Sequence, residues 1–320
     1  MTETQPAAVQ PELTIVVPVF NEEAVIEMFY AAMCPVLDGI TPDWDIVFVN
    51  DGSRDRTPEI IASLHARDPR VKLVDFARNH GKEIALTAGL DHAHGRAVIP
   101  MDVDLQDPPD VIARMVAQWR AGYDMVLARR SDRSEDGFLK RLTANGFYQV
   151  MNQVSDVKLP DNVGDFRLMD QRVVAVLRQY RERTRFMKGI FASLGFRQTV
   201  VEYARPQRAA GTTKFRAWKL WTLALEGIVS FSSAPLKIWT YIGLAGAALA
   251  LIFMIYIVLT TLLFGNTVPG YASLISFVLL FNSLTLIGLG VIGEYIARIF
   301  YEVKGRPLYI LRGTLGIDQN

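Results

Sequence analysis

Residues 13–19 read LTIVVPV, a short β-branched run that ends at Asn21, and this run decides the fold that we expect. Further runs of this kind lie at residues 45–50, 71–76, 96–102 and 124–129. Helical patterns lie between them, at residues 22–37, 57–67, 82–93 and 109–120. Strands that alternate with helices predict βαβ units, and therefore an α/β domain with a mainly parallel sheet covered on both faces.

Polar residues follow the predicted strands directly, and they include Asn21, Asp51 and Asp102. Ligands of parallel α/β sheets bind at the carboxyl ends of the strands, so we expect the functional site there. A dinucleotide-binding Rossmann domain would carry G-x-G-x-x-G after its first strand, where this chain has PVFNEEAV at residues 18–25. The P-loop signature G-x-x-x-x-G-K-[ST] is also missing from the sequence.

Acidic residues crowd the segment DVDLQDPP at residues 102–109. Alternate side chains of an extended segment point the same way, so we expect Asp102 and Asp104 to face one side. Two carboxylates and a nearby amide oxygen suit a hard cation such as Mg²⁺ or Mn²⁺, which keeps open positions for diphosphate oxygens. Such a pair also occurs as solvated turn carboxylates, and the pattern alone leaves both interpretations open.

Two long apolar runs lie near the C-terminus. Ile238–Phe264 and Tyr271–Gly293 hold about 27 and about 23 residues without a charge, and about 20 suffice to span a bilayer. Buried helices of a soluble core rarely run uncharged for so long. We therefore expect two transmembrane helices within residues 236–297, after a domain that covers residues 13–212.

Basic residues flank these runs on their outer sides, at Lys237, Arg298, Lys304, Arg306 and Arg312. The connector at residues 265–270, GNTVPG, carries no charge. The positive-inside rule predicts a multi-pass protein of the inner (plasma) membrane, with the domain and both termini in the cytoplasm. Residues 1–12 lack the features of a signal peptide, and we expect them to be disordered.

Residues 213–235 show apolar side chains at helical spacing among three cations. This pattern favours a juxtamembrane amphipathic helix in the membrane interface, with an ordinary helix packed on the domain as the alternative. The tail, residues 298–320, contains RPLYIL at 306–311, which we interpret as a strand that returns to the domain. The apolar runs contain glycines that allow close helix packing within a chain or between copies, which is compatible with a homo-oligomer: Gly243, Gly246, Gly288, Gly290 and Gly293.

Charge and composition exclude several classes of protein. A formal net charge of +1 argues against a nucleic-acid partner. Hydrophobic residues make up 50% of the chain and charged residues 21%, so disorder is excluded as the main state. Cys34 is the single cysteine, which excludes an internal disulfide and any zinc site with two Cys ligands from one chain.

Five motifs together resemble family 2 glycosyltransferases of GT-A fold: PVFNEE at 18–23, VNDGSRDRT at 49–57, RNHGKEIALTAGLDHA at 78–93, MDVDLQDPP at 101–109 and DFRLMD at 165–170. Within that family the chain is similar to polyisoprenyl-phosphate glycosyltransferases, which include bactoprenol glucosyltransferases and dolichol-phosphate mannose synthases. The resemblance runs from about Leu13 to Leu311, and the two apolar runs mark the membrane-anchored bacterial subgroup.

This resemblance implies transfer of one sugar, with inversion, from a nucleotide-diphosphate sugar to polyisoprenyl (undecaprenyl) phosphate, with Mg²⁺ or Mn²⁺ as cofactor. UDP-glucose is the expected donor, and GDP-mannose and UDP-N-acetylglucosamine stay open. A processive polysaccharide synthase would show a QxxRW motif and more spans. A membrane scaffold would have no use for the acidic residues in these settings.

The resemblance also assigns residues to roles. The nucleotide-sugar pocket would hold Pro18, Phe20, Asn21, Glu23, Asp51, Lys82 and Asp102. The metal ligands would be Asp102, Asp104 and Gln106, and the residue that matches the family's catalytic base is Asp165. The acceptor and diphosphate would meet Arg130, Arg133, Arg208 and Lys214. The chain departs from the family with GTTKF at 211–215, where relatives often have GESKY, and with His80, where many have an aromatic residue.

The chemistry of the acceptor bears on the role of Asp165. A lipid monophosphate has a second pKa near about 6, so it is largely dianionic at neutral pH and needs little help from a base. We therefore expect Asp165 to orient the nucleophile or an arginine at least as much as it takes a proton. The four predicted cations would balance the charge, although a solvated basic surface beside anionic lipid is the alternative for them.

Overall fold

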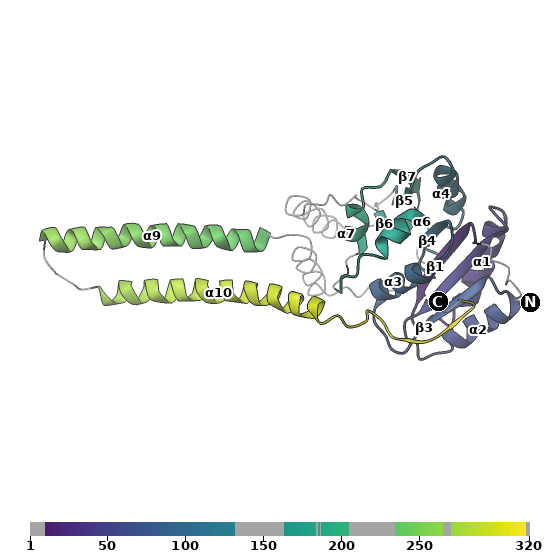
Figure 1. The fold of residues 1–320 in the computed structure, drawn as a ribbon, viewed down its shortest axis with the longest axis horizontal. Helices are drawn as coiled ribbons and strands as arrows, with labels where there is room; N and C mark the ends of the chain where they lie inside the picture. The colour runs from purple at the N-terminus through teal and green to yellow at the C-terminus, as the bar shows by residue number, and fades with distance from the viewer. Residues whose placement is uncertain are drawn as a thin grey trace, which may run out of the picture.

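The computed structural model describes residues 10–131, 163–183, 185, 187–204, 234–264 and 270–317. An α/β domain precedes a two-helix hairpin that extends away from it (Figure 1). The first nine residues of the predicted disordered N-terminus lie outside the described residues, as does the predicted juxtamembrane helix up to residue 233.

The strands are β1 (Leu13–Val19), β2 (Trp44–Asn50), β3 (Val71–Phe76), β4 (Ala97–Pro100), β5 (Met125–Arg130), β6 (Val163–Asp170), β7 (Gln198–Tyr203) and β8 (Leu311–Leu315). The helices are α1 (Ile26–Asp38), α2 (Thr57–Arg67), α3 (Lys82–His92), α4 (Val111–Arg120), α6 (Gln171–Leu177), α7 (Met187–Ser193), α9 (Ala234–Phe264) and α10 (Tyr271–Val303). The predicted strands and helices up to residue 130 are all present. The largest differences are that α1 begins at Ile26 instead of residue 22, and that β4 ends at Pro100 instead of residue 102.

One sheet holds all eight described strands in the order β7-β5-β6-β4-β1-β2-β3-β8. The pairs β1–β2, β1–β4, β2–β3 and β5–β7 are parallel, and β3–β8, β4–β6 and β5–β6 are antiparallel. The prediction of a mainly parallel α/β sheet is confirmed. Sequence reasoning missed β6 and β7, and β6 runs against β4 in the middle of the sheet.

Both faces of the sheet are covered, which explains why β1 is an almost continuous apolar run. Ile15 and Val17 pack with α1, α2 and α4, whereas Val16 packs against α3 on the other face. A Cβ atom on Gly89 of α3 would lie 2.2 Å from Val16 Cγ1, so only glycine lets α3 approach the sheet this closely. This close packing fixes the axis of α3, and the helix begins at the carboxyl-end edge of the strands.

The chain returns to the domain after α10. The strand predicted at residues 306–311 begins at Leu311 in the structure, and it pairs antiparallel with β3 at the edge of the sheet. Before this strand, the ring of Tyr309 stacks on Phe76 with centroids 5.2 Å apart, and its hydroxyl donates a hydrogen bond to Asp91 (3.0 Å). We call residues 304–315 the return segment. It ties the end of α10 to the domain.

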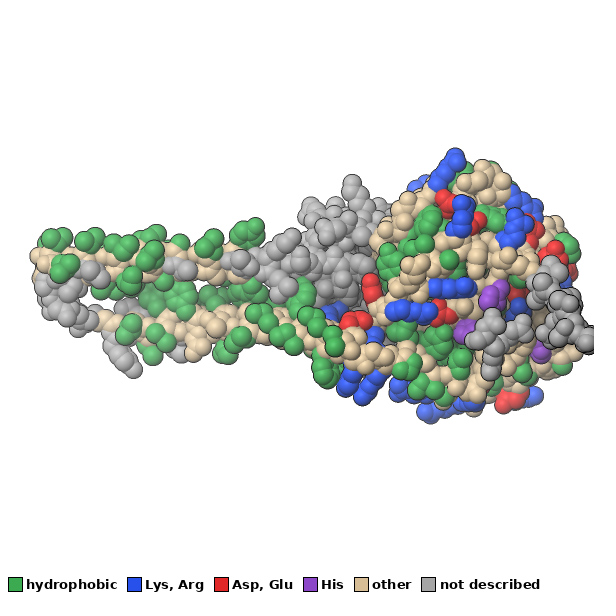
Figure 2. All heavy atoms as spheres, viewed as in Figure 1, with side chains coloured by type: hydrophobic (Ala, Val, Ile, Leu, Met, Phe, Trp, Pro, Cys, Tyr) green, Lys and Arg blue, Asp and Glu red, His purple; other side chains and the backbone are tan. Residues whose placement is uncertain are grey.

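α9 and α10 lie side by side, and both are long and apolar enough to cross a membrane by length and composition (Figures 1 and 2). Figure 2 shows hydrophobic side chains along the hairpin, with the charged side chains on the domain and near the junction. Gly246 faces Phe281, and Gly288 faces Trp239 across the hairpin, and a slot of about 450 Å³ lies between the helices there. The predicted role of small residues in helix packing therefore applies to these two glycines within one chain.

Asp68, which follows α2, provides a test of stability against pH. Burial tends to raise its pKa, but hydrogen bonds from Arg70 (2.8 and 3.0 Å) and from the Tyr30 hydroxyl (2.9 Å) lower it below the usual value. A lowered folded-state pKa means that Asp68 contributes stability above about pH 4 and that this contribution is lost as the pH falls. We expect Asp68→Asn to lower stability at pH 7 by about 1–3 kcal/mol. Thermal unfolding measured from pH 7 to pH 3 should show the gap to wild type closing, and a gap that stays constant would contradict this account.

Candidate active site

The loops after β1 and β2 are joined at the carboxyl-end edge of the sheet. Asn21 N–H donates to Ser53 Oγ and Asn21 Oδ1 accepts from Arg54 N–H, both at 2.9 Å. Glu23 Oε2 accepts from Arg56 N–H at 3.0 Å. Asn21 has a positive φ of 55°, so its backbone turns sharply where β1 has ended. Two residues predicted for the nucleotide pocket thus also build the loop framework.

The first predicted contacts with a nucleotide are arranged around this framework. Pro18 lies within β1, and the ring of Phe20, just beyond the strand, is 45% exposed although it is large and apolar. An exposed aromatic ring beside strand ends is suited to stacking on a flat apolar group. The roles of Pro18 and Phe20 toward a nucleotide stay predictions.

Asp51 fixes the loop that precedes α3. Its carboxylate is buried and accepts hydrogen bonds from His80 N–H (2.6 Å) and Gly81 N–H (2.9 Å). Burial raises the pKa of Asp51 even though these two donors oppose the shift. Gly52 has φ +69°, and a Cβ atom there would lie 2.5 Å from the Arg78 carbonyl carbon, so glycine is required at this position. Asp51 therefore positions the start of α3, and its predicted role toward a nucleotide stays a prediction.

The acidic segment after β4 is a turn, so the prediction of an extended segment is wrong. β4 ends at Pro100, the next residues form a turn, and Leu105 has a left-handed φ of 54°. Asp104 Oδ1 accepts a hydrogen bond from Gln106 N–H at 3.1 Å. A non-glycine residue in this conformation is uncommon, and such backbone concentrates at functional sites. The turn, and not strand alternation, positions the acidic side chains.

Carboxylates nevertheless gather at this turn. Burial raises the pKa of Glu22, and the negative charges of Asp104, Asp55 and Asp102 raise it further. Four carboxylates from the loops after β1, β2 and β4 thus act on one another. Such a concentration of negative charge attracts a cation.

Asp165 reaches the same place from β6. The antiparallel register sets Val98 opposite Met169, and continuing it beyond β4 brings Asp165 beside Asp102. Lys82, the first residue of α3, joins the two acids. Its Nζ lies 2.6 and 2.8 Å from the two carboxylate oxygens of Asp102 and 3.4 Å from Asp165 Oδ2. Burial would lower the pKa of Lys82, but the attraction of the two carboxylates outweighs it and raises the pKa, so the ammonium stays protonated.

Arg130 ends β5 beside the acidic turn. Its Nε donates to the Tyr203 hydroxyl (3.3 Å), and its guanidinium lies 4.0 Å from Asp107. The Tyr203 hydroxyl donates to Asp107 Oδ1 at 2.5 Å, and burial together with Asp107 raises the pKa of Tyr203 to about 12. Sequence reasoning found Arg130 but missed this support. Asp107 was part of the quoted acidic segment, whereas Tyr203 ends a strand that was not predicted.

Of the predicted cations, the structure brings Lys82 and Arg130 to the acidic turn. Arg133, Arg208 and Lys214 lie outside the described residues.

Similarity to known proteins identifies the family of the chain. The family model "Glycosyl transferase family 2" matches residues 14–178, from β1 through α6. The chain belongs to glycosyl transferase family 2. It is 52% identical over 301 residues, 94% of this chain, to the SfII prophage-derived bactoprenol glucosyl transferase of Shigella flexneri, of which the match covers 97%. The identity is also 52%, with 94% of this chain and 98% of the relative covered, for the prophage bactoprenol glucosyl transferase homolog of Escherichia coli K12.

Among solved structures, the chain is similar to the mannosyltransferase PcManGT from Pyrobaculum calidifontis, determined in complex with GDP-Man and Mn²⁺. The identity is 18%, the match covers 91% of this chain and 88% of that one, and the TM-score is 0.44. Family membership and the named relatives make this chain a glycosyltransferase.

This family 2 glycosyltransferase also buries an arginine near Asp165 that the sequence did not single out. Arg167 is 3% exposed, donates to the Gly164 carbonyl oxygen (2.6 Å), and has its guanidinium 3.9 Å from the centre of the Phe191 ring in α7. Burial lowers the pKa of Arg167 to about 10, so the side chain is still charged at neutral pH. It lies two residues from Asp165 on the same face of β6, and the negative charge of Asp165 partly offsets the effect of burial on Arg167.

The oxygen atoms of the acidic turn fit a divalent cation. Asp102 and Asp104 offer carboxylates, and Gln106 Oε1 is buried without a hydrogen-bond partner among the described residues. Asp165 Oδ1 is likewise buried without a hydrogen-bond partner among the described residues. In the described part of the chain, no three His, Cys, Asp or Glu side chains form a ready-made cage. A cation held here would complete its coordination with water or ligand oxygens, as Mg²⁺ usually does in phosphate-binding sites.

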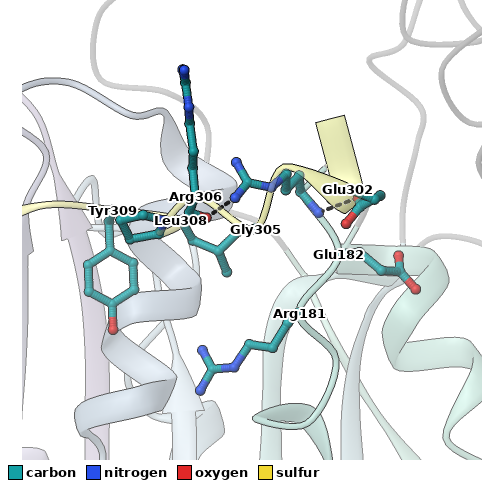
Figure 3. Close-up of a pocket in the computed structure, with 9 residues that line it drawn as sticks. Arg181, Glu182, Glu302, Gly305, Arg306, Leu308 and Tyr309 are labelled. Carbon is teal, nitrogen blue, oxygen red and sulfur yellow. Dashed lines mark hydrogen bonds between the residues drawn. The ribbon is translucent and has the colours of Figure 1, made fainter. Parts of the chain in front are cut away.

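A hollow lies where the return segment meets the domain (Figure 3). It has a volume of about 830 Å³ and is lined by Arg181, Glu182, Arg183, Glu302, Gly305, Arg306, Pro307, Leu308 and Tyr309. Arg183 N–H donates to Glu302 Oε1 (2.7 Å), and Arg181 pairs with Asp91 (2.8 Å). Asp91 is nine residues along α3 from Lys82, which is about 14 Å of helix. This hollow is therefore a junction between domain and hairpin, apart from the acidic turn.

Proposed function

We propose that this glycosyltransferase moves one glucose from UDP-glucose to polyisoprenyl (undecaprenyl) phosphate at the cytosolic face of the inner membrane, with inversion and with Mg²⁺ or Mn²⁺. The observation that carries the proposal is the meeting of Asp102 and Asp165 on Lys82 beside the acidic turn. The bactoprenol glucosyl transferases that match nearly the whole chain support the choice of acceptor and sugar.

The acidic turn would hold the donor. Asp102, Asp104 and Gln106 supply the oxygens for the cation, which when bound neutralises charge on the leaving diphosphate. Phe20 offers an exposed ring near the strand ends for the flat base of the nucleotide, and the joined loops around Asn21 and Glu23 form the wall on that side. These contacts would direct the sugar toward Asp165.

Asp165 and Arg130 would bind and orient the acceptor phosphate. A phosphate monoester is mostly dianionic at neutral pH, so its oxygen attacks the sugar without prior removal of a proton. Asp165 carries a free oxygen, Oδ1, that can orient the nucleophile or an arginine, and Lys82 and Arg130 offset the repulsion between carboxylates and phosphate. Attack from the face opposite the leaving diphosphate inverts the anomeric centre in one displacement.

The hairpin would set the height of this site above the bilayer. We place residues 13–212 in the cytosol, a juxtamembrane helix at 213–235, two spans within 236–297 and a cytosolic tail at 298–320. The apolar lengths of α9 and α10 and the cations on their outer flanks support this arrangement. Association into homo-oligomers through exposed faces of the hairpin belongs to the same proposal.

A panel of radiolabelled nucleotide sugars tests the function. Purified full-length protein in detergent receives undecaprenyl phosphate, Mn²⁺ and either UDP-glucose, GDP-mannose or UDP-N-acetylglucosamine, and products are extracted into organic solvent. We expect label in the organic phase with UDP-glucose. Label there only with another donor would change the sugar, whereas polymer or free sugar in place of a glycolipid would contradict the proposed reaction.

Tyr203→Phe tests the support of Arg130. The change removes the hydroxyl between Arg130 and Asp107, so the guanidinium loses a fixed position. We expect the KM for the lipid phosphate to rise by about three- to tenfold, the equivalent of one ordinary hydrogen bond of about 1 kcal/mol, with little change in kcat. Steady-state kinetics with varied acceptor measures this. Tyr123→Phe, at the opposite end of β5, is the matched control, and an equal effect there would contradict the assignment.

A further inference from the structure

Lys82 occupies an unusual place for a lysine. It is the first residue of α3, where the helix macrodipole disfavours a positive charge. Its ammonium lies between a carboxylate that follows β4 and a carboxylate on β6, at 2.6 Å from Asp102 and 3.4 Å from Asp165. The side chain is 49% exposed, so it stands at the mouth of the site and not in the core. The two carboxylates, and not the helix, stabilise the charge there.

Contacts within the domain fix the backbone position of Lys82. Asp51 binds the amides of His80 and Gly81, which directly precede it. Gly89, two turns further along α3, presses the helix against β1. The start of α3 is therefore fixed relative to the strand ends. The ammonium reaches Asp102 because of this fixed geometry, with only its own flexible side chain left to move.

The ammonium of Lys82 occupies some of the oxygen atoms that a metal ion would use and leaves others without a partner. Both carboxylate oxygens of Asp102 contact Lys82, at 2.6 and 2.8 Å. Gln106 Oε1 and Asp165 Oδ1, by contrast, are buried and have no hydrogen-bond partner among the described residues. A divalent cation that uses Asp102 competes with the ammonium for these oxygens, and the like charges also repel. Phosphate oxygens of a bound diphosphate would offer the displaced ammonium a new partner.

We propose that Lys82 is a built-in competitor of the divalent metal: it occupies Asp102 in the free enzyme and transfers to the donor diphosphate when metal and nucleotide bind together. This inference rests on the proposed function, which supplies the metal and the diphosphate. Its consequence is cooperativity, because each ligand removes the obstacle to the other. Metal alone would bind weakly, and metal with nucleotide would bind well.

Binding of Mn²⁺ to the purified full-length protein tests the inference without turnover. Free Mn²⁺ is measured by electron paramagnetic resonance, first without nucleotide and then with UDP, for wild type, Lys82→Met and Lys82→Arg. Without nucleotide, we expect Lys82→Met to bind Mn²⁺ about fivefold more tightly than wild type, the size of a partly exposed ion pair, and Lys82→Arg to stay near wild type. With UDP present, we expect the order to reverse, because only the cationic side chains gain the diphosphate.

A matched control is the ion pair of Lys72 with Asp45 (2.6 Å), at the opposite end of the sheet. Lys72→Met removes the same kind of contact and should leave Mn²⁺ binding unchanged. Asp104→Ala should weaken binding in every background, which identifies the site.

The outcomes separate the two proposals. Mn²⁺ binding that depends on Asp104 but is no tighter in Lys82→Met overturns the role of Lys82 and leaves the proposed function standing. An equal gain from UDP in wild type and in Lys82→Met overturns the transfer of the ammonium. Both proposals are overturned if neither wild type nor Lys82→Met binds Mn²⁺, with or without UDP. They are also overturned if Asp104→Ala leaves Mn²⁺ binding unchanged.

Discussion

Asp104→Ala is expected to lower the rate of sugar transfer by about 10³-fold, which corresponds to the several kcal/mol that a bound cation contributes to such a reaction. The exposed carboxylate of Asp104 lies in the turn after β4 and contacts the amide of Gln106, so its loss removes a charge without opening the core. Transfer of radiolabelled glucose to undecaprenyl phosphate measures the effect.

The control for this variant is Asp110→Ala. Asp110 is an exposed acid just before α4, and its side chain makes no capping hydrogen bond. It should keep near wild-type activity. For Asp104→Asn, which retains one weaker oxygen ligand, raising the Mn²⁺ concentration should restore part of the rate. Equal activity of Asp104→Ala and wild type would remove the metal from the mechanism.

Asp165→Asn should have the second largest effect, a fall in kcat of about 10²-fold, as expected when a group that orients charge in the transition state is lost. The amide keeps the shape of the carboxylate and an oxygen near the position of Oδ1, but it no longer carries the negative charge that faces Lys82 and Arg167. The pH–rate profile is the decisive measurement. If Asp165 orients the nucleophile, the profile keeps its shape in the variant.

Proton abstraction by Asp165 would give a different profile. Suppose that the wild-type rate rises with pH through a pKa well above about 6, and that this rise is lost in Asp165→Asn. That result would show that the acceptor phosphate has to be deprotonated at this site. A near-wild-type rate for Asp165→Asn would remove the residue from the reaction altogether. Thermal unfolding of the variant beside wild type shows whether the domain remains intact.

The first half of the domain could be predicted well from sequence because its signals are local. Strands such as β1 and β2 are buried on both faces, and polar residues mark their ends. β6 and β7 were missed because their patterns are mixed: β6 buries Arg167 among apolar residues, and β7 keeps Glu202 exposed. Burial of Arg167 cannot be predicted without its partners, the Gly164 carbonyl oxygen and the Phe191 ring, and the ring belongs to a different element of the chain.

The candidate site divides in the same way. Asp102, Asp104 and Asp165 were found because motifs placed them, whereas the local geometry of the acidic turn was wrongly expected to be extended. Leu105 adopts a left-handed conformation, which no propensity of leucine predicts. The bridge from Asp102 through Lys82 to Asp165 joins three elements far apart in sequence, and only the antiparallel placement of β6 beside β4 brings them together.

The return segment has a practical consequence for making soluble fragments. β8 covers the outer side of β3, and Tyr309 covers Phe76. A fragment truncated before the hairpin would leave the β3 edge with unpaired N–H and C=O groups, an invitation to edge-to-edge aggregation. An internal deletion that removes α9 and α10 but splices the last residues back onto the domain would keep that edge closed, and is the better choice for crystallisation.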